Sequence, residues 1–274
     1  MRRGMKAALA ASMAAMLVAA APQPELAATM APVEGSQMAF YPSGSGPVTV
    51  VLEAGFGGDH TSWRAVQPLL AGKARVVSYD RLGHGKSSPS ARPRSAKVAA
   101  EQLHDGLARA GFAPPYLLVG HSFGGAIARI FADRWPAEVH GLVLVDPSHE
   151  DFGIRAAREA TSVFAAMLES QLADDDRDTP HMQREVLGWE ASMLQLRQTK
   201  PPPRDRTILL SAGRMMADTP ALQRLWLDVA TNWAKDTGVR HRIIDAPHNI
   251  QRTNPDEVVR AVMQLLPPEQ TGVR

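Results

Sequence analysis

The stretch YLLVGHSFGGA at residues 116–126 contains an apolar run, a glycine-rich corner and the start of an alanine-rich segment. The uncharged run 116–119 has the length and composition of a strand buried inside a sheet. Residues 126–135 have a helical pattern, and Pro136 limits it because proline cannot continue a helix. The sequence therefore predicts a strand, a sharp turn and a helix in immediate succession.

The turn, residues 120–124, matches the pattern G-x-S-x-G with Ser122 at its centre. A serine on so tight a corner has strained dihedral angles, and its neighbours two positions away must be small. The corner lifts the hydroxyl of Ser122 clear of the sheet, at a helix N-terminus whose partial positive charge favours developing negative charge. In this strand–turn–helix setting the motif indicates a serine nucleophile. The alternative is a structural glycine-rich turn.

Short apolar runs alternate with helical patterns along the rest of the chain, which predicts a mostly parallel sheet flanked by helices. The predicted strands are 48–52, 75–79, 116–119, 141–145, 207–212 and 240–244, and the predicted helices include 63–70 with Thr61 or Ser62 as N-cap, 95–110, 126–135 and a last one from about Asn254. Residues 149–206 are helical in pattern without a clear strand. We expect them to form a helical cap over one end of the sheet, the alternative being a solvated side decoration.

A serine nucleophile needs a base, and the base needs an acid that orients it. His248 is the best placed of the nine histidines, because it follows the predicted strand 240–244 in a loop before the last helix. The chain order serine, acid, histidine is the one expected when the serine sits on a strand-to-helix corner of an α/β sheet. We therefore predict His248 as the general base.

Several motifs in the same order are similar to those of the α/β-hydrolase superfamily, in the branch that includes small esterases, cofactor-free haloperoxidases and proline iminopeptidases. The matching segments are 52–57, 80–87, 120–124 and 142–146, then His248 with Pro255 downstream. The resemblance covers about residues 38–266. It implies an α/β-hydrolase fold, with a mostly parallel central sheet, flanking helices and a helical cap.

The resemblance also implies an oxyanion hole made of two main-chain N–H groups. One belongs to Phe123, the residue after the nucleophile, and the other to Phe56 in the loop after the first long strand. Relatives often carry a histidine at the position of Ala54, but the donor is a main-chain group, so little catalytic effect is expected. The two aromatic side chains are also expected to line the pocket.

The acid of the triad has two candidates, since family members place it after either of two strands. Asp146 directly follows the predicted strand 141–145, whereas Asp218 lies in a longer loop after 207–212 and could instead cap the helix that Pro220 opens. We prefer Asp146, although it could also be only a turn residue before Pro147.

The first 21 residues have the pattern of a secretory signal peptide: basic residues within Met1–Lys6, a 15-residue apolar run 7–21 and small residues at its end. An uncleaved anchor or an ordinary alanine-rich helix is the alternative. Residues 22–36 are expected to be a disordered tether, and 37–274 the α/β-hydrolase domain with its cap at about 149–206. The predicted location is periplasmic or secreted, without a stable membrane span after cleavage.

The composition excludes several classes of protein. The chain has 274 residues, no cysteine and a formal charge of +2, so disulfide frameworks, thiolate metal sites and cysteine nucleophiles are ruled out, and nucleic-acid binding is not indicated. No metal or cofactor is expected to be required, and the oligomeric state stays open.

The expected function is that of a serine hydrolase that cleaves a small ester through an acyl-enzyme intermediate, with Ser122, His248 and Asp146 as triad and an ester or amide as its small-molecule partner. The alternatives are lactonase, aminopeptidase or perhydrolase activity on the same triad, or a non-catalytic binding protein of the same fold.

Overall fold

The computed structural model describes residues 26–165, 184–185, 187–214 and 219–268. The predicted signal peptide, the start of the tether, part of the predicted cap and Asp218 lie outside these residues.

The described strands form one sheet in the order β1-β2-β4-β3-β5-β6-β7-β8. Their bounds are β1 Thr29–Val33, β2 Ser36–Ser43, β3 Thr49–Glu53, β4 Arg75–Asp80, β5 Tyr116–His121, β6 Val139–Val145, β7 Thr207–Ala212 and β8 Arg240–Ile244. The pairs β1–β2 and β2–β4 are antiparallel, and the strands from β4 to β8 run parallel. The carboxyl ends of β3 to β8 therefore meet at one edge of the sheet, which is where open α/β sheets bind ligands.

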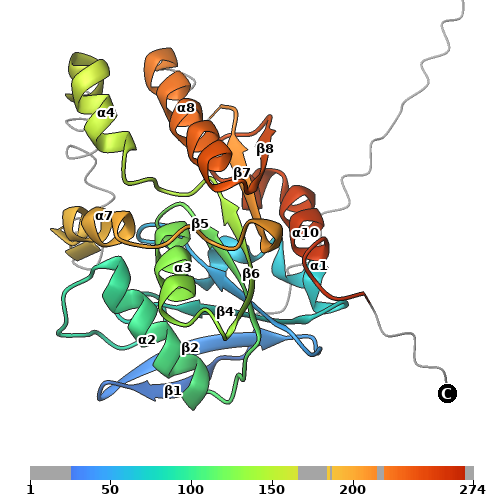
Figure 1. Cartoon of the computed structure of the whole chain (residues 1–274). Coiled ribbons are helices and arrows are strands. Elements are labelled where there is room, and N and C mark those ends of the chain that lie inside the picture. The colour runs from blue at the N-terminus through green and yellow to red at the C-terminus, as the bar shows by residue number, and fades with distance from the viewer. Residues whose placement is uncertain (1–25, 166–183, 186, 215–218, 269–274) are drawn as a thin grey trace, which may run out of the picture.

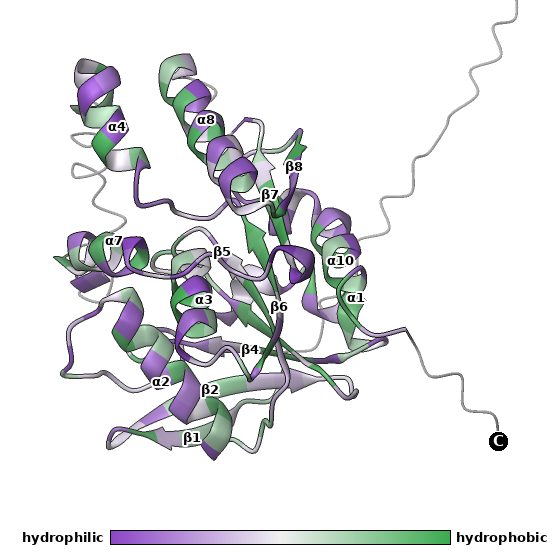
Figure 2. Cartoon of the chain, in the orientation of Figure 1, coloured by the Kyte–Doolittle hydropathy of each residue, from purple (hydrophilic) through white to green (hydrophobic). Residues whose placement is uncertain are grey.

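Both faces of the central strands β3, β5, β6 and β7 are buried, which explains why these strands are mainly apolar in sequence. Leu118 of β5 packs in one core with helices α2 (Ala96–Arg109) and α3 (Phe123–Arg134). Its neighbours Leu117 and Val119 pack in a second core with α10 (Pro255–Met263) and α1 (Gln67–Ala71). Figure 1 shows these helices on both sides of the sheet, and Figure 2 shows the hydrophobic central strands.

The described part of residues 149–206 is helical. It contains α4 (Phe152–Glu159) and α7 (Trp189–Arg197), followed by the short 3₁₀ helix η3 (Arg204–Arg206). Helix α4 lies beside α8 (Pro220–Thr237), joined to it by an apolar cluster that includes Phe152 and Trp226, and α7 lies against α2 and α3 (Figure 1).

The predicted tether 22–36 is wrong for residues 29–36, which form β1 and the turn into β2. Ala31 and Val33 alternate into the core, and β1 tolerates Pro32 because it is an edge strand. Glu34 and Gly35 both have positive φ, 50° and 77°, as a two-residue type I′ hairpin turn requires. The composition hides this hairpin because only every second residue of the short strand is buried.

The prediction of one continuous helix over residues 63–70 is also wrong. A 3₁₀ helix η1 (His60–Trp63) comes first and α1 follows, and the N-cap of η1 is Asp59, whose carboxylate accepts the N–H of Thr61 at 2.9 Å.

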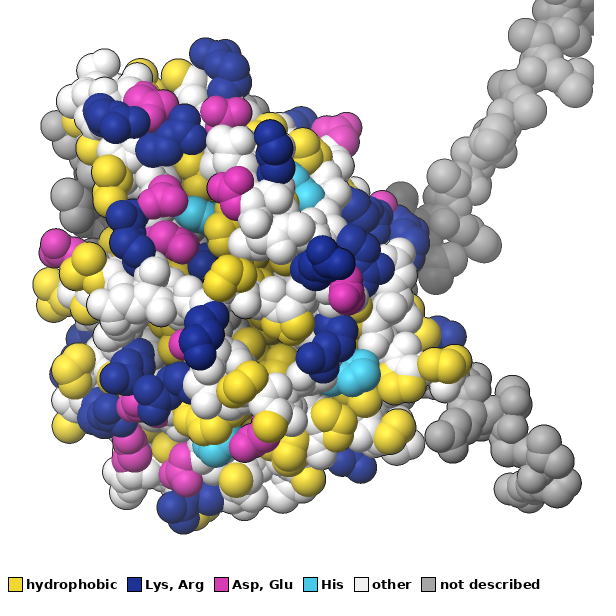
Figure 3. All heavy atoms as spheres, viewed as in Figure 1, with side chains coloured by type: hydrophobic (Ala, Val, Ile, Leu, Met, Phe, Trp, Pro, Cys, Tyr) yellow, Lys and Arg dark blue, Asp and Glu magenta, His cyan; other side chains and the backbone are white. Residues whose placement is uncertain are grey.

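The surface carries interspersed charges of both signs on the face drawn in Figure 3. Among the described helices, none has the length and apolar character needed to cross a membrane.

Candidate active site

Ser122 occupies a strained corner at the carboxyl end of β5. Its φ and ψ are 53° and −119°, a conformation that strongly favours glycine. A Cβ on Gly120 would lie 2.4 Å from the carbonyl oxygen of Gly124, and one on Gly124 would lie 2.4 Å from that of Glu53. Both flanking glycines of the motif are therefore required by space, as the sequence predicts.

The corner is fixed to the end of β6 by main-chain hydrogen bonds. The N–H of Ser122 donates to Val145 at 3.1 Å, and its carbonyl accepts the N–H of Ser148 at 3.0 Å. Ser122 is also the N-cap residue of α3, which starts at Phe123 rather than at the predicted residue 126. The N–H of Phe123 consequently lies in the first turn of a helix, among donors without an intrahelical partner.

Asp146, the residue after β6, is fully buried and has a positive φ of 44°. Its Oδ1 accepts hydrogen bonds from the N–H of Ala212 and from Nε1 of Trp226, both at 2.8 Å. Its Oδ2 lies 2.6 Å from Nδ1 of His248. Among the described non-glycine residues only Glu34, Ser122 and Asp146 have positive φ, and backbone strain of this kind is concentrated at functional sites.

His248 reaches this place from the loop between β8 and the short helix α9 (Ile250–Thr253). Because Asp146 faces Nδ1, the imidazole carries its proton there and keeps the lone pair on Nε2. Nε2 of His121 donates to the carbonyl of His248 at 3.1 Å, and the centroids of the two imidazole rings lie 4.6 Å apart. Since His121 precedes Ser122, the structure brings the His248 loop to the corner of the motif.

Of the two candidate acids, the structure places Asp146 against His248, while Asp218 lies outside the described residues. Asp245, which lies in the same loop as His248, is nearly fully exposed and pairs with Arg214.

Burial and the neighbouring His248 lower the pKa of His121 from 6.5 to about 3. Between these values the unfolded chain binds a proton that the folded protein does not, so acid destabilises the fold. We expect this histidine to lower the free energy of unfolding by up to about 1.4 kcal/mol for each pH unit below 6.5. Urea unfolding of the wild type and His121→Asn from pH 7 to pH 4.5 measures the effect.

The variant is expected to have a flatter dependence of stability on pH. Burial also lowers the pKa of His149 and of His241, so some acid sensitivity remains in both proteins. Equal slopes in the two proteins would contradict the assignment to His121.

The loop after β3, which carries Phe56, lies directly over this corner. A Cβ on Gly55 would lie 3.2 Å from Cβ of Ser122 and 2.8 Å from Nδ1 of His121. The rings of Phe56 and Phe123 meet edge to face with centroids 5.4 Å apart. The structure thus brings the two residues predicted for the oxyanion hole together beside Ser122.

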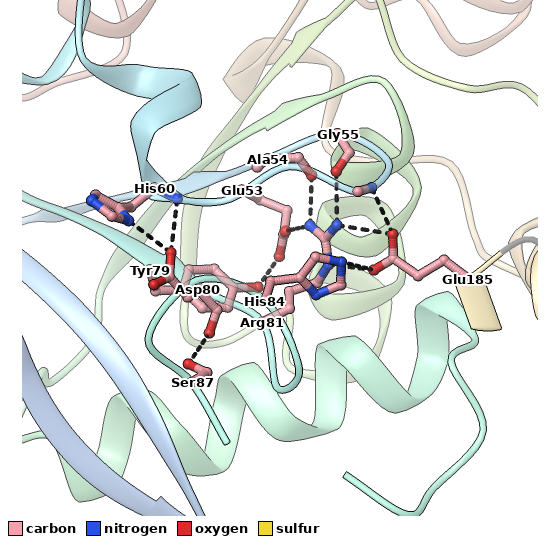
Figure 4. Close-up of polar contacts among 11 residues, drawn as sticks. Glu53, Ala54, Gly55, His60, Tyr79, Asp80, Arg81, His84, Ser87 and Glu185 are labelled. Carbon is pink, nitrogen blue, oxygen red and sulfur yellow. Dashed lines mark hydrogen bonds and ion pairs between the residues drawn. The ribbon is translucent and has the colours of Figure 1, made fainter. Parts of the chain in front are cut away.

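A buried charge cluster under the same loop was not predicted from the sequence (Figure 4). Arg81 lies between Glu53 and Glu185, with Nη1 2.7 Å from Glu53 and Nε 2.8 Å from Glu185, and all three side chains are at most 4% exposed. The hydroxyl of Tyr79 also donates to Glu53. The one available signal was an acidic residue ending an apolar strand, since a buried carboxylate needs a partner.

Another buried carboxylate, that of Asp80, holds the neighbouring loops together. It accepts hydrogen bonds from the main chain and ring of His60, from the hydroxyl of Tyr41 and from the N–H of Lys86. Together with Asp59 and His60, Asp80 has ligand atoms within 4.8 Å of one another. Because Asp80 and Asp59 already serve as acceptors within the protein, we interpret this group as structural.

A family model described as alpha/beta hydrolase fold matches residues 48–185, half of the chain. The chain belongs to the α/β-hydrolase family. The predicted family and the predicted mostly parallel sheet with flanking helices are confirmed.

Several curated proteins are similar to parts of the chain. The uncharacterized protein YqjL of Bacillus subtilis is 36% identical over 108 residues, which are 39% of this chain and 43% of that protein. An AB hydrolase superfamily protein of Gibberella zeae is 28% identical over 185 residues, 64% of this chain and 58% of that protein. The chain thus spans less than two thirds of either relative.

The solved structure of a thermophilic esterase from Thermogutta terrifontis matches 87% of this chain and 97% of its own, with a TM-score of 0.59 and 20% identity. This likeness shows a shared fold.

Proposed function

We propose that the chain is a serine hydrolase that cleaves small carboxylic esters through an acyl-enzyme intermediate. The observation that carries the proposal is the pairing of buried Asp146 with Nδ1 of His248, whose carbonyl is bound by His121, the residue before the strained Ser122. A carboxylate that holds the imidazole in this tautomer leaves Nε2 able to accept the serine proton.

In the proposed reaction, Nε2 of His248 takes the proton of Ser122 as Oγ attacks the ester carbonyl carbon. The C–O bond to the alcohol then breaks, and the imidazolium returns the proton to the leaving alkoxide. A water molecule, deprotonated by His248, then attacks the acyl carbon. The bond from this carbon to Oγ breaks, the imidazolium returns the proton to Oγ of Ser122, and the carboxylic acid is released. Asp146 stabilises the imidazolium that forms in both halves of the reaction.

The main-chain N–H groups of Phe56 and Phe123 are the proposed donors to the oxyanion. The N–H of Phe123 lies at the N-terminus of α3, where the partial positive charge of the helix stabilises a negatively charged oxygen. The rings of Phe56 and Phe123 contact each other, and Gly55 lies close to Ser122. Both observations support assigning the two amides to one oxyanion hole. Losing one such donor costs about 3 kcal/mol in other enzymes.

The pairing of the carboxylates beside the loop of Phe56 favours an ester over an aminoacyl amide as the substrate. A peptidase that recognises a free amine needs an available carboxylate near the substrate. Glu53 and Glu185, which lie beside this loop, are already paired with Arg81. This argument leaves ester and lactone substrates, which share the same chemistry.

Turnover of p-nitrophenyl acetate and butyrate, a panel of lactones and a panel of aminoacyl amides tests the proposal. We expect saturable hydrolysis of the esters, with the highest kcat/KM in the ester class. A higher kcat/KM for lactones would change the substrate class and keep the mechanism. No turnover above the buffer rate in any class would overturn the proposal in favour of a non-catalytic binding protein.

We further propose that the activity is exported to the periplasm or medium. The support is the basic and then apolar pattern of residues 1–21.

A further inference from the structure

The peptide bond between Gly55 and Phe56 is held by Arg81. Nη2 of Arg81 donates to the carbonyl of Gly55 at 2.7 Å, and the N–H of Gly58 donates to the same carbonyl at 3.1 Å. A trans peptide is planar, so its C=O and N–H point in opposite directions. Fixing the carbonyl toward Arg81 therefore turns the N–H of Phe56 away from Arg81.

The peptide after Phe56 is held by Glu185. The N–H of Gly57 donates to Oε2 of Glu185 at 2.9 Å, and the same carboxylate binds Nε and Nη2 of Arg81 at 2.8 and 3.2 Å. The hydrogen bond from Gly58 to Gly55 closes a four-residue β-turn, residues 55–58. Gly57 is the third residue of this turn, and its φ is 65°, which glycine adopts without strain. Both peptides that flank Phe56 are thus anchored to one ion pair (Figure 4).

The third nitrogen of the guanidinium, Nη1, fixes the start of the same loop. Nη1 of Arg81 binds Glu53 at 2.7 Å and the carbonyl of Ala54 at 2.8 Å. The whole planar group is engaged, with every acceptor on residues 53–55 or on Glu185. A lysine ammonium has three donors at one point and cannot reproduce this pattern.

Burial acts against every charge in this cluster, and the ion pairs oppose it. Burial alone would lower the pKa of Arg81, but Glu185 and Glu53 hold it above its ordinary value. Burial raises the pKa of Glu53, whereas Arg81 and His84 outweigh burial at Glu185 and lower its pKa. Removing one partner would leave an uncompensated buried charge, which strongly destabilises a site.

We propose that Arg81 is a positioning residue for the oxyanion-hole amide of Phe56, and that Glu185, from the segment before α7, completes this positioning through Gly57. The inference rests on the proposed function, because the orientation of this amide matters only if an oxyanion forms at Ser122. Glu185 lies 104 residues from Arg81 in sequence, so the inserted helical segment helps to set the geometry of the site.

Kinetics of Arg81→Lys and Glu185→Gln on p-nitrophenyl butyrate test the catalytic part. We expect kcat to fall about 10- to 100-fold in Arg81→Lys, since a misplaced donor forfeits part of the roughly 100- to 1,000-fold effect of an oxyanion-hole group. KM is expected to change less than about 3-fold, because the interaction acts in the transition state. Glu185→Gln is expected to change kcat in the same direction.

Arg129 supplies the matched control. It is another buried arginine, 6% exposed, and it binds Glu150 through both terminal nitrogens at 2.9 and 3.0 Å. Arg129→Lys is expected to lower the melting temperature by an amount similar to that of Arg81→Lys and to leave kcat within about 2-fold of the wild type. An equal fall of kcat in both variants would mean that Arg81 acts through general stability, which overturns the inference.

Hydrogen–deuterium exchange of the fragment that covers residues 54–63 tests the anchoring without any substrate. Faster exchange at Gly57 and Gly58 is expected in Arg81→Lys and in Glu185→Gln, but not in Arg129→Lys. If Arg81→Lys does not fold, Glu185→Gln carries the test, because it keeps the size of the side chain.

Unchanged exchange in folded variants would overturn the inference whether or not the wild type is active. A wild type that hydrolyses no substrate would instead overturn the proposed function, so the two failures are distinguishable.

Discussion

Replacing Ser122 with alanine is expected to lower kcat/KM for p-nitrophenyl butyrate by about 10⁴-fold or more, since removal of a triad serine has effects of this size or larger in other hydrolases. The variant keeps the amides of Phe56 and Phe123, so weak residual catalysis above the buffer rate is expected. Steady-state hydrolysis at equal concentrations of folded protein measures the loss.

Ser122→Gly provides the control for folding. It is expected to be as inactive as Ser122→Ala but more stable than the wild type by about 1 kcal/mol, because glycine adopts the conformation at φ 53° without strain. Urea unfolding gives the difference. A Ser122→Ala variant with half of the wild-type activity would contradict the role of Ser122.

Replacing Asp146 with asparagine is the second large effect that we expect. Oδ1 of Asp146 accepts two N–H donors, from Ala212 and Trp226, so the amide oxygen of asparagine must occupy that position. Its NH₂ group then faces Nδ1 of His248 and forces the imidazole proton onto Nε2. In this tautomer His248 cannot accept the proton of Ser122, and kcat is expected to fall about 10⁴-fold, as in a serine protease with the same exchange.

Asp218→Asn and Asp245→Asn are the comparison variants for this prediction. Each is expected to lose far less activity than Asp146→Asn. Asp245 is exposed and pairs with Arg214, away from Nδ1 of His248. A larger loss in Asp218→Asn than in Asp146→Asn would show that the acid had been assigned to the wrong residue.

The sheet could be predicted where local sequence and burial agree. The strands β7 and β8 begin and end at the predicted residues, and β5 differs only by two residues at its end. β5 and β7 are leucine-rich because the sheet is covered on both sides there, whereas β8 is an edge strand in which only Ile244 is buried. The β1–β2 hairpin was missed for the opposite reason, since an edge strand buries alternate residues and tolerates proline.

The site could be predicted as far as motifs are local. Ser122 and its glycines are contiguous, and Asp146 and His248 each follow a recognisable strand. The Arg81 cluster could not be predicted in this way, because its partners lie 28 and 104 residues away in sequence. The hydrogen bond from Trp226 to Asp146 could not be predicted either, because Trp226 lies 80 residues away in sequence, on α8. Such contacts arise from tertiary packing and leave no periodic signal in the sequence.

Covalent labelling of the serine tests the central claim most directly. A fluorophosphonate reacts with an activated serine hydroxyl, expels fluoride and forms a stable phosphonate ester on the serine, which peptide mass spectrometry locates. We predict stoichiometric labelling of Ser122 in the wild type with parallel loss of esterase activity, much slower labelling in Asp146→Asn, and no label on that peptide in Ser122→Ala. An enzyme that hydrolyses esters while Ser122 stays unlabelled, or that carries the label on another residue, would contradict the account.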